Sequence, residues 1–377
     1  MLVIFFSRCF HDNSLMADDP RGSGYAGSKA CTSCHQDIYS SYSHSNHYKT
    51  SSAVDSNVFK KPAAAFKSPF YFSDSSYIRV EEKDNALFQL YFVNGKENVS
   101  GKFDIAFGSA GKAQTYGYWK ENKLYQLPLT YFADMNTWAN SPGFSARHAN
   151  FGRVIESRCF ECHASYIDRE FLQSGRLSVI ENLDRNSIVY GIDCERCHGP
   201  ALKHATFQQE HPSIKQSRYI ASIKSLTRQQ HLDVCAVCHS GNDQAKQKSL
   251  FAFTPGDTLS HFYYPDFGAG NAEPDVHGKQ LQLLQLSSCF KNSTLTCTTC
   301  HTAHGPEENK MKEFIAQCVN CHQNHVHTPG IVKSTENSNC INCHMPLQSS
   351  KIIYFNNGAA AKNFPYFIRT HRIAVYH

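Results

Sequence analysis

Seven copies of one pentapeptide, Cys-x-x-Cys-His, supply most of the reactive side chains of this 377-residue chain. Two thiols separated by two residues can each bond to one vinyl group of a single haem, and the next residue's imidazole can then bind the iron. Each copy therefore predicts one covalently attached haem c, seven in all. The cysteines of the seven copies are Cys31, Cys34, Cys159, Cys162, Cys194, Cys197, Cys235, Cys238, Cys297, Cys300, Cys318, Cys321, Cys340 and Cys343. The histidines that follow them are His35, His163, His198, His239, His301, His322 and His344.

Zinc binding and thiol-disulfide exchange are the competing interpretations of a Cys-x-x-Cys pair. Zinc sites combine such pairs two at a time and set no rule for the residue that follows. Here the number of pairs is odd and histidine always follows. A thioredoxin-type redox motif would occur once, near a βαβ pattern. The repeated spacing therefore favours haem attachment over both alternatives.

A second histidine bound to each iron would give the low-spin haems typical of electron transfer. The chain has 21 histidines, so fourteen remain once the seven motif histidines are subtracted. His304 and His325 each lie three residues after a motif histidine, which predicts one helical turn and binding to a neighbouring iron. His204 follows Pro200, a residue that starts helices, and can act in the same way. The predicted second ligands are His47, His148, His204, His277, His304, His325 and His371.

The composition predicts little conventional hydrophobic core. Hydrophobic residues make up 41% of the chain, and the 26 Phe and 19 Tyr side chains have rings that pack well against porphyrin. The formal charge of +5 invites a nucleic-acid partner. Haem propionates and ferric irons would bring the loaded protein to a net charge of about −2, however, so we expect no nucleic-acid binding.

The order of the motifs predicts a mainly α and irregular fold wrapped around haems, with a small antiparallel β insertion near residues 70–126. Alternating apolar and polar residues, with Asn94-Gly95 and Glu121-Asn122 at expected turns, predict four to six strands there. Helical segments are expected over 169–183, 225–232 and 278–288. The predicted domains are an N-terminal tether over 1–28, a first haem-binding segment over 29–66, a β-rich insertion over 67–136 and a six-haem helical module over 137–377.

Thioether attachment of haem takes place outside the cytoplasm, so the motifs predict export to the periplasm, or to the outer membrane and cell surface, of a Gram-negative bacterium. The apolar run from Met1 to Phe6 is too short for a signal peptide or a membrane span. Three interpretations stay open: Cys9 is a lipidated membrane tether, the start is truncated, or Cys9 is a plain thiol. Cys289 is expected to be a buried thiol, with axial ligation as the alternative.

The extended motifs resemble the multihaem cytochromes related to cytochrome c-554 and hydroxylamine oxidoreductase. The residues that carry the resemblance are Cys31 to His35 with His47, Cys194 to Pro200 with His204, Cys297 to His304, and Cys340 to Pro346 with His371. The resemblance implies helical wrapping, stacked and perpendicular haem pairs, and second ligands at His47, His204, His304 and His371. The related pentahaem nitrite reductases hold their catalytic iron with Cys-x-x-Cys-Lys, and this chain has no such site.

Two functions fit this pattern. The favoured one is electron transfer through a chain of closely packed, mostly bis-histidine haems. Its partners would be other cytochromes or a quinol-linked complex, and copies of the chain can assemble together. The alternative is an oxidoreductase that acts on nitrite, hydroxylamine, tetrathionate or a similar compound at one five-coordinate haem. Enzymatic activity stays an open question, because no catalytic ligand is visible in the sequence.

Overall fold

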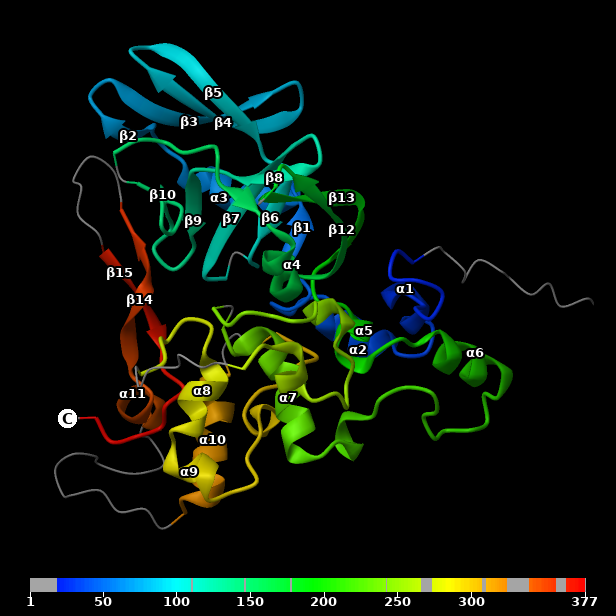
Figure 1. Cartoon of the computed structure of the whole chain (residues 1–377). Coiled ribbons are helices and arrows are strands. Elements are labelled where there is room, and N and C mark those ends of the chain that lie inside the picture. The colour runs from blue at the N-terminus through cyan, green and yellow to red at the C-terminus, as the bar shows by residue number, and fades with distance from the viewer. Residues whose placement is uncertain are drawn as a thin grey trace, which may run out of the picture.

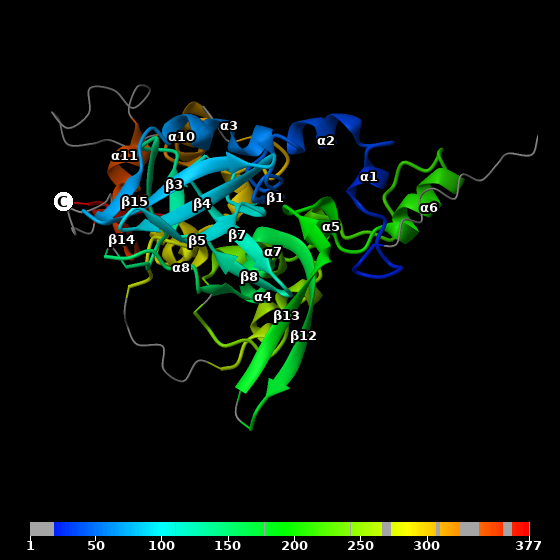
Figure 2. The ribbon, with the colours of Figure 1, turned by 90° about the horizontal axis from the view of Figure 1, so that it is seen from above.

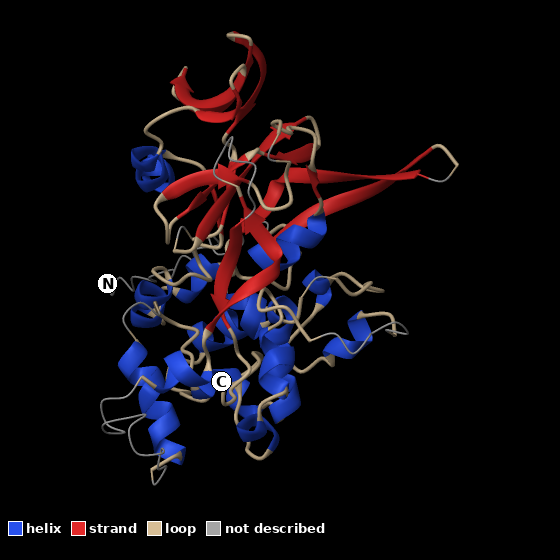
Figure 3. Cartoon of the chain, turned by 90° about the vertical axis from the view of Figure 1, so that its left-hand side faces the viewer, coloured by secondary structure: helices blue, strands red, loops and turns tan. Residues whose placement is uncertain are grey.

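Strands are as abundant as helices in this protein. The computed structural model describes residues 19–109, 111–145, 147–176, 178–241, 243–265, 273–306, 310–323, 339–356 and 364–376. Only 28% of the structure is helical and 30% is strand, so the prediction of a mainly α fold is wrong. The β-rich part forms the upper half of Figure 1, and the motif-bearing helices form the lower half. Figure 3 shows the same separation from the side.

A four-stranded antiparallel sheet forms the outer layer of the β-rich part. Its strands follow one another in chain order: β2 (Phe70–Ser73), β3 (Ser76–Lys83), β4 (Ala86–Val93) and β5 (Lys96–Lys102). Asn94 and Gly95, between β4 and β5, have φ of 50° and 75°. These are the left-handed conformations that a two-residue hairpin turn requires. The hairpin predicted at Asn94-Gly95 is therefore confirmed.

A seven-stranded sheet lies between the outer sheet and the helices. Five strands follow the order β1 (Ser51–Ala53), β6 (Ile105–Phe107), β7 (Ala113–Lys120), β8 (Lys123–Gln126) and β11 (Val154–Ile155). The remaining two, β9 (Leu129–Phe132) and β10 (Thr137–Asn140), form a hairpin that pairs with β7. The described part of residues 70–126 contains seven strands, β2 to β8, where four to six were expected, and the β-rich part extends well beyond them.

Aromatic side chains fill the space between the two sheets. The ring of Phe103 lies 4.7 Å from that of Phe59 and 4.7 Å from that of Tyr116, centroid to centroid. Trp138 stacks on Tyr116 at 5.6 Å and donates a hydrogen bond from Nε1 to the Pro62 carbonyl in α3 (Ser56–Ala65). Buried aromatic rings of this kind supply large hydrophobic stabilisation. This region therefore has a conventional core, contrary to the expectation drawn from composition.

Residues 169–183, predicted to be helical, form most of a long antiparallel hairpin. Its strands are β12 (Ala164–Ser174) and β13 (Ser178–Tyr190), and Gly175, with φ 77°, lies between them. Glycine and the β-branched residues of β13 favour a hairpin over a helix. Ile167 and Leu183 are buried at the hairpin's base against Phe160, whereas its far end projects from the body in Figure 2.

The helices and 3₁₀ turns of the motif-bearing part are short, and only some of them contain a motif. The helices are α1 (Ser28–Cys31), α2 (Gln36–Tyr42), α4 (Ser157–His163), α5 (Cys194–His198), α6 (Leu202–Glu210), α7 (Arg228–His239), α8 (Gln280–Gln285), α9 (Ser288–Lys291), α10 (Met311–Cys321) and α11 (Cys340–His344). The 3₁₀ turns are η2 (Ile223–Ser225), η3 (Leu250–Ala252), η4 (Leu259–Phe262) and η5 (Cys297–Thr299). The helix expected over 225–232 is shifted to α7, and that over 278–288 is divided between α8 and α9.

A second hairpin joins the C-terminal part of the chain to the seven-stranded sheet. It consists of β14 (Leu347–Phe355) and β15 (Phe364–Arg369), in a region predicted to be helical or irregular. Phe355 and Tyr366 pack against Phe132 of β9 at centroid distances of 5.2 and 5.6 Å. Figures 1 and 2 both show the motif-bearing helices crossing the molecule from α1 and α5 at one side to α11 at the other.

Candidate haem-binding sites

A motif closes one helical turn, which gathers its three reactive side chains. The amide of His35 donates to the Cys31 carbonyl at 2.9 Å, and that of His301 donates to the Cys297 carbonyl at 3.0 Å. Residues separated by three or four positions share one face of a helix. The pentapeptide spacing therefore places both thiols and the imidazole on the same side, as attachment of one haem requires.

Polar residues just before two motifs fix where the motif helices begin. Asp193 accepts a hydrogen bond from the Arg196 amide at 2.9 Å at the start of α5. Asn339 accepts one from the Asn342 amide at 3.2 Å at the start of α11. These side chains satisfy amides that the first helical turn leaves unpaired. The sequence therefore specifies a helix start immediately before these cysteines.

Cysteines of different motifs lie against one another, which sets the order of the motifs in space. The motifs are numbered 1 to 7 along the chain. Cys31 of motif 1 lies against Cys194 of motif 3, and Cys162 of motif 2 lies against Cys238 of motif 4. Cys235 of motif 4 lies against Cys297 of motif 5. The pKa of Cys194, of Cys238 and of Cys297 is lowered to about 7, because the neighbouring thiol donates a hydrogen bond to each thiolate. Motifs 6 and 7 are also neighbours, since α10 contacts α11.

Three motif histidines face a second histidine from a distant part of the chain. The ring centroids of His198 and His304 are 5.9 Å apart, with planes 10° from parallel. The pair His301 and His371 is 6.1 Å apart at 25°, and the pair His47 and His239 is 6.1 Å apart at 80°. Two imidazoles that bind one metal ion from opposite sides, with metal–nitrogen bonds of about 2 Å, have centroids roughly 6 Å apart. These pairs therefore fit a shared iron.

Backbone carbonyls orient several of the imidazoles. Nδ1 of His198 is 3.4 Å from the Ala221 carbonyl, and Nδ1 of His344 is 2.9 Å from the Ala374 carbonyl. A carbonyl can only accept a hydrogen bond, so Nδ1 must donate, and Nε2 of the neutral ring keeps its lone pair for a metal. The residues present thus fit haem iron in ring orientation as well as in spacing.

Motif 2 has a similar arrangement around His163. Nδ1 of His163 lies 3.2 Å from Thr50 Oγ1. Burial lowers the pKa of His163, and the nearby charge of His277 lowers it further. The buried carboxylate of Asp275 accepts hydrogen bonds from the His277 amide at 2.8 Å and from Ser350 Oγ at 2.9 Å. Asp275 therefore holds the segment with His277 against β14.

The remaining predicted second ligands differ in what surrounds them. His204 lies on α6, with Nδ1 2.8 Å from the Arg218 carbonyl, and both it and His35 are close enough to influence His198. His148 is exposed and lies outside the pairs described above. His325 falls outside the described residues, as does Cys9. The helical turn predicted to carry His304 is wrong, because His301 and Thr302 are irregular and His304 lies in a short turn followed by Gly305-Pro306.

Buried charged residues inside the motifs were not predicted from the sequence. The Glu195 carboxylate in motif 3 accepts hydrogen bonds from the amides of Ala26, Gly27 and Ala201 at 2.8–2.9 Å. The Arg21 guanidinium contacts the same carboxylate at 3.0 Å. This cluster fastens the segment before motif 1 onto motif 3. The sequence signal for this cluster is the pair of charged residues, Glu195 and Arg196, at the two variable positions of motif 3.

Cys289 lies close to the thiols of motifs 5 and 6 and is only partly buried, whereas the sequence predicts a buried thiol. Burial raises the pKa of Cys300, and the neighbouring thiol of Cys289 contributes to the rise. Its position agrees with a packing role beside the motifs.

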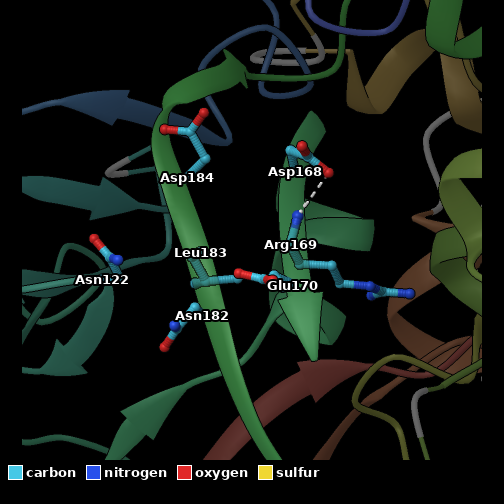
Figure 4. A pocket seen from close by; sticks show the side chains of 7 residues that line it. All are labelled: Asn122, Asp168, Arg169, Glu170, Asn182, Leu183 and Asp184. Atoms are coloured by element: carbon cyan, nitrogen blue, oxygen red, sulfur yellow. Dashed lines mark hydrogen bonds between the residues drawn. The ribbon is translucent and has the colours of Figure 1, made fainter. Parts of the chain in front are cut away.

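A shallow recess at the base of the long hairpin contains no residue of the motifs. It is lined by Asn122, Asp168, Arg169, Glu170, Asn182, Leu183 and Asp184. Figure 4 shows the side chain of Arg169 extending away from Asn122 and Asp184. Across the part of the chain that the structure describes, no group of three or more His, Cys, Asp or Glu residues converges on a metal position. The recess therefore lacks a set of converging ligands.

Comparisons with known proteins agree with the motif geometry. The family model described as cytochrome c554 and c-prime matches residues 30–69 and 115–199. The chain is 25% identical over 211 residues to multiheme cytochrome MtrA of Shewanella baltica (strain OS185), covering 54% of this chain and 56% of that protein. It thus spans about half the length of this curated relative.

The fold is similar to a crystal structure of outer cell wall cytochrome OcwA. The TM-score is 0.50 with 16% sequence identity, and the similarity covers 93% of this chain and 80% of that one. At this identity the likeness concerns the fold alone. In the described ranges, none of the helices has the length and apolar character needed to cross a bilayer.

Proposed function

We propose that this chain, which is a multihaem c-type cytochrome with covalently bound haem c, carries seven haems and relays electrons along them outside the cytoplasm. The seven pentapeptides would each hold one haem through two thioethers and one imidazole. Each haem iron can take up or release one electron while its ligands stay bound. The polypeptide would then hold the haems close together and occupy both axial positions of each iron, so that other ligands do not bind.

The observation that carries this proposal is the pairing of imidazoles from separate segments. His304 of motif 5's trailing turn faces His198 of motif 3, and His47, beyond motif 1, faces His239 of motif 4. A second imidazole occupies the position at which a substrate would otherwise bind. Bis-histidine ligation changes little between oxidation states, which suits electron transfer better than catalysis.

The contacts between motifs support a relay and not seven isolated centres. Motif 3 is hydrogen-bonded to the segment before motif 1, since the Cys194 amide donates to Ser28 Oγ at 3.4 Å. Motif 5 reaches α7 of motif 4, where Thr298 Oγ1 lies 3.2 Å from His231 Nε2. With the sulfur contacts described above, these links give a continuous series of neighbouring motifs. Haems attached to neighbouring cysteines would have neighbouring edges.

We propose redox-partner proteins as the physiological partners, either other cytochromes or a quinol-linked complex. The periplasm or the outer surface of a Gram-negative cell is the proposed location, and the similarity in fold to the outer cell wall cytochrome OcwA supports a setting outside the cytoplasm. Tethering through Cys9 and assembly with further copies remain predictions from the sequence.

Electron paramagnetic resonance (EPR) of the oxidised protein tests the proposal against the alternative reductase. We expect every iron to be low-spin, with no change on addition of nitrite, hydroxylamine or cyanide, because two imidazoles close each iron. A reductase needs one iron with an open face. A high-spin signal that shifts when nitrite is added would reject the electron-carrier proposal and favour the oxidoreductase.

A further inference from the structure

Motifs 2, 3 and 4 meet at a single backbone oxygen, the carbonyl of Glu161. The Arg196 guanidinium of motif 3 donates a hydrogen bond to it from Nη2 at 3.1 Å. The Cys238 sulfur of motif 4 lies 3.7 Å from the same oxygen. The Cys162 sulfur, next to Glu161, lies 4.0 Å from the Val237 carbonyl. One peptide group therefore connects three segments that are far apart in the sequence.

Arg196 is a buried cation in this junction. Its exposed fraction is 9%, and its guanidinium lies 5.7 Å from the Phe251 ring centroid. In the described part of the chain, no carboxylate comes within 4.0 Å of it, and its Nε has no hydrogen-bond partner. Burying a charge without a paired carboxylate is costly. Among the side chains that the structure describes, the guanidinium therefore contributes a positive charge with no carboxylate partner at ion-pair distance.

The nearby carboxylates are bound by other cations. Glu161 is 2.6 Å from Lys246 Nζ, and its other oxygen accepts a hydrogen bond from Ser249 Oγ at 2.9 Å. Asp193 is 2.9 Å from the Arg21 guanidinium. The Glu161 and Asp193 carboxylates are thus paired with Lys246 and Arg21, while Arg196 is directed at the meeting point of the three motifs.

Arg196 lies beside sulfur atoms of two motifs. It directly precedes Cys197 in the chain, and its guanidinium shares the Glu161 carbonyl with the Cys238 sulfur. Because these sulfur atoms are the attachment points for haems, the Arg196 charge would act on haems bound there.

From this geometry we propose that Arg196 is a positioning residue that joins motifs 2, 3 and 4 and raises the reduction potentials of the haems bound at them. A reduced haem carries one positive charge fewer than an oxidised one, so a nearby buried cation favours reduction. Electrons would collect at this junction, from which contacts lead to motif 1 through Cys194 and to motif 5 through Cys235. The inference rests on the proposed electron-relay function.

Spectroelectrochemical titration of the haem-loaded protein tests this role. Arg196→Gln removes the charge but keeps a donor for the Glu161 carbonyl, whereas Arg196→Lys keeps the charge. We expect Arg196→Gln to shift part of the titration curve, at most three of the seven haems, to lower potential, and Arg196→Lys to stay near the parent curve. Arg79→Gln, which replaces an exposed arginine of β3 away from the motifs, is the matched control and should leave the curve unchanged.

An Arg196→Gln curve that superimposes on the parent curve would overturn the proposal. Equal downward shifts in Arg196→Gln and Arg196→Lys would also overturn it, because the charge would then not be the cause. If Arg196→Gln fails to fold, Arg196→Lys provides the test. Reduction potentials like those of the parent protein support the role of the positive charge, and lowered potentials reject that role. A parent protein without redox-active haem would instead reject the proposed function itself, before any variant is compared.

Discussion

The imidazole rings of His198 and His304 have centroids 5.9 Å apart and planes 10° from parallel, although they come from different motifs. His198 is fixed by its own hydrogen bond to the Ala221 carbonyl, so the approach of His304 determines the pair. Such pairs link motifs that are not consecutive in the chain, here motifs 3 and 5. A chain folded in this way would tie each haem to at least two parts of the backbone.

Replacement of His304 tests this relationship. In His304→Ala the haem at motif 3, and not the one at motif 5, should lose its second ligand and become high-spin. Near-parallel imidazole planes give a rhombic low-spin EPR signal, so one rhombic signal should disappear as a high-spin signal grows. His261→Ala, which removes an exposed imidazole, is the control and should leave the spectrum unchanged. An unchanged spectrum in His304→Ala would reject the pairing.

Replacement of His47 should remove a different signal. Its ring is 80° from that of His239, and nearly perpendicular imidazoles give a highly anisotropic low-spin signal. In His47→Ala we expect that signal to be replaced by a high-spin one, with the rhombic signals retained. Loss of a rhombic signal in its place would show that His47 serves another iron.

Removal of the Arg21 side chain should loosen the segment before motif 1. Arg21 is 2.8 Å from Asp19, 2.9 Å from Asp193 and 3.0 Å from Glu195, and its side chain is 4% exposed. Breaking a buried ion pair leaves carboxylates unpaired, so Arg21→Ala should lower the free energy of unfolding by about 3–5 kcal/mol. Denaturant titration measures this value.

An exposed pair provides the comparison for Arg21. Lys83 and Glu97 are 3.1 Å apart with both side chains more than 40% exposed. Lys83→Ala should therefore change the free energy of unfolding by less than about 1 kcal/mol. Equal effects in Arg21→Ala and Lys83→Ala would mean that the buried cluster does not fasten the segment.

Truncation of Phe103 tests whether the β-rich part has a core of its own. Phe103 is 2% exposed, so Phe103→Ala should cost about 3–5 kcal/mol of unfolding free energy. The absorption and EPR spectra of the haems should stay unchanged while the protein is folded. Val99→Ala, on the exposed face of β5, should cost far less. Haem loss from folded Phe103→Ala would show that the core supports the motifs directly.

The repeated motifs made covalent haem attachment predictable, because the chemistry depends on five consecutive residues. The β2–β8 strands were also predictable, since local alternation and turns such as Asn94-Gly95 specify them. The hairpin over residues 164–190 was not, because its short-range pattern does not separate a strand from a helix until Gly175 is placed in the turn. The prediction of a helical module after residue 137 was wrong because the motifs specify only their own short helical turns. The segments between the motifs include the strands β12 to β15.

The partners of the motif histidines could not be predicted as pairs. The sequence supplies candidates such as His371, but only the folded chain brings His371 to His301. The same holds for Arg196 and Glu161, whose contact joins two motifs. Contacts between distant segments depend on the tertiary fold, which short-range patterns do not determine.

Intact mass spectrometry of the purified, folded protein tests the central claim most directly. The account predicts a mass equal to that of the polypeptide plus seven haems, retained under denaturing conditions because each haem is bonded to sulfur. A mass that matches the bare polypeptide in a protein that is still folded would contradict it.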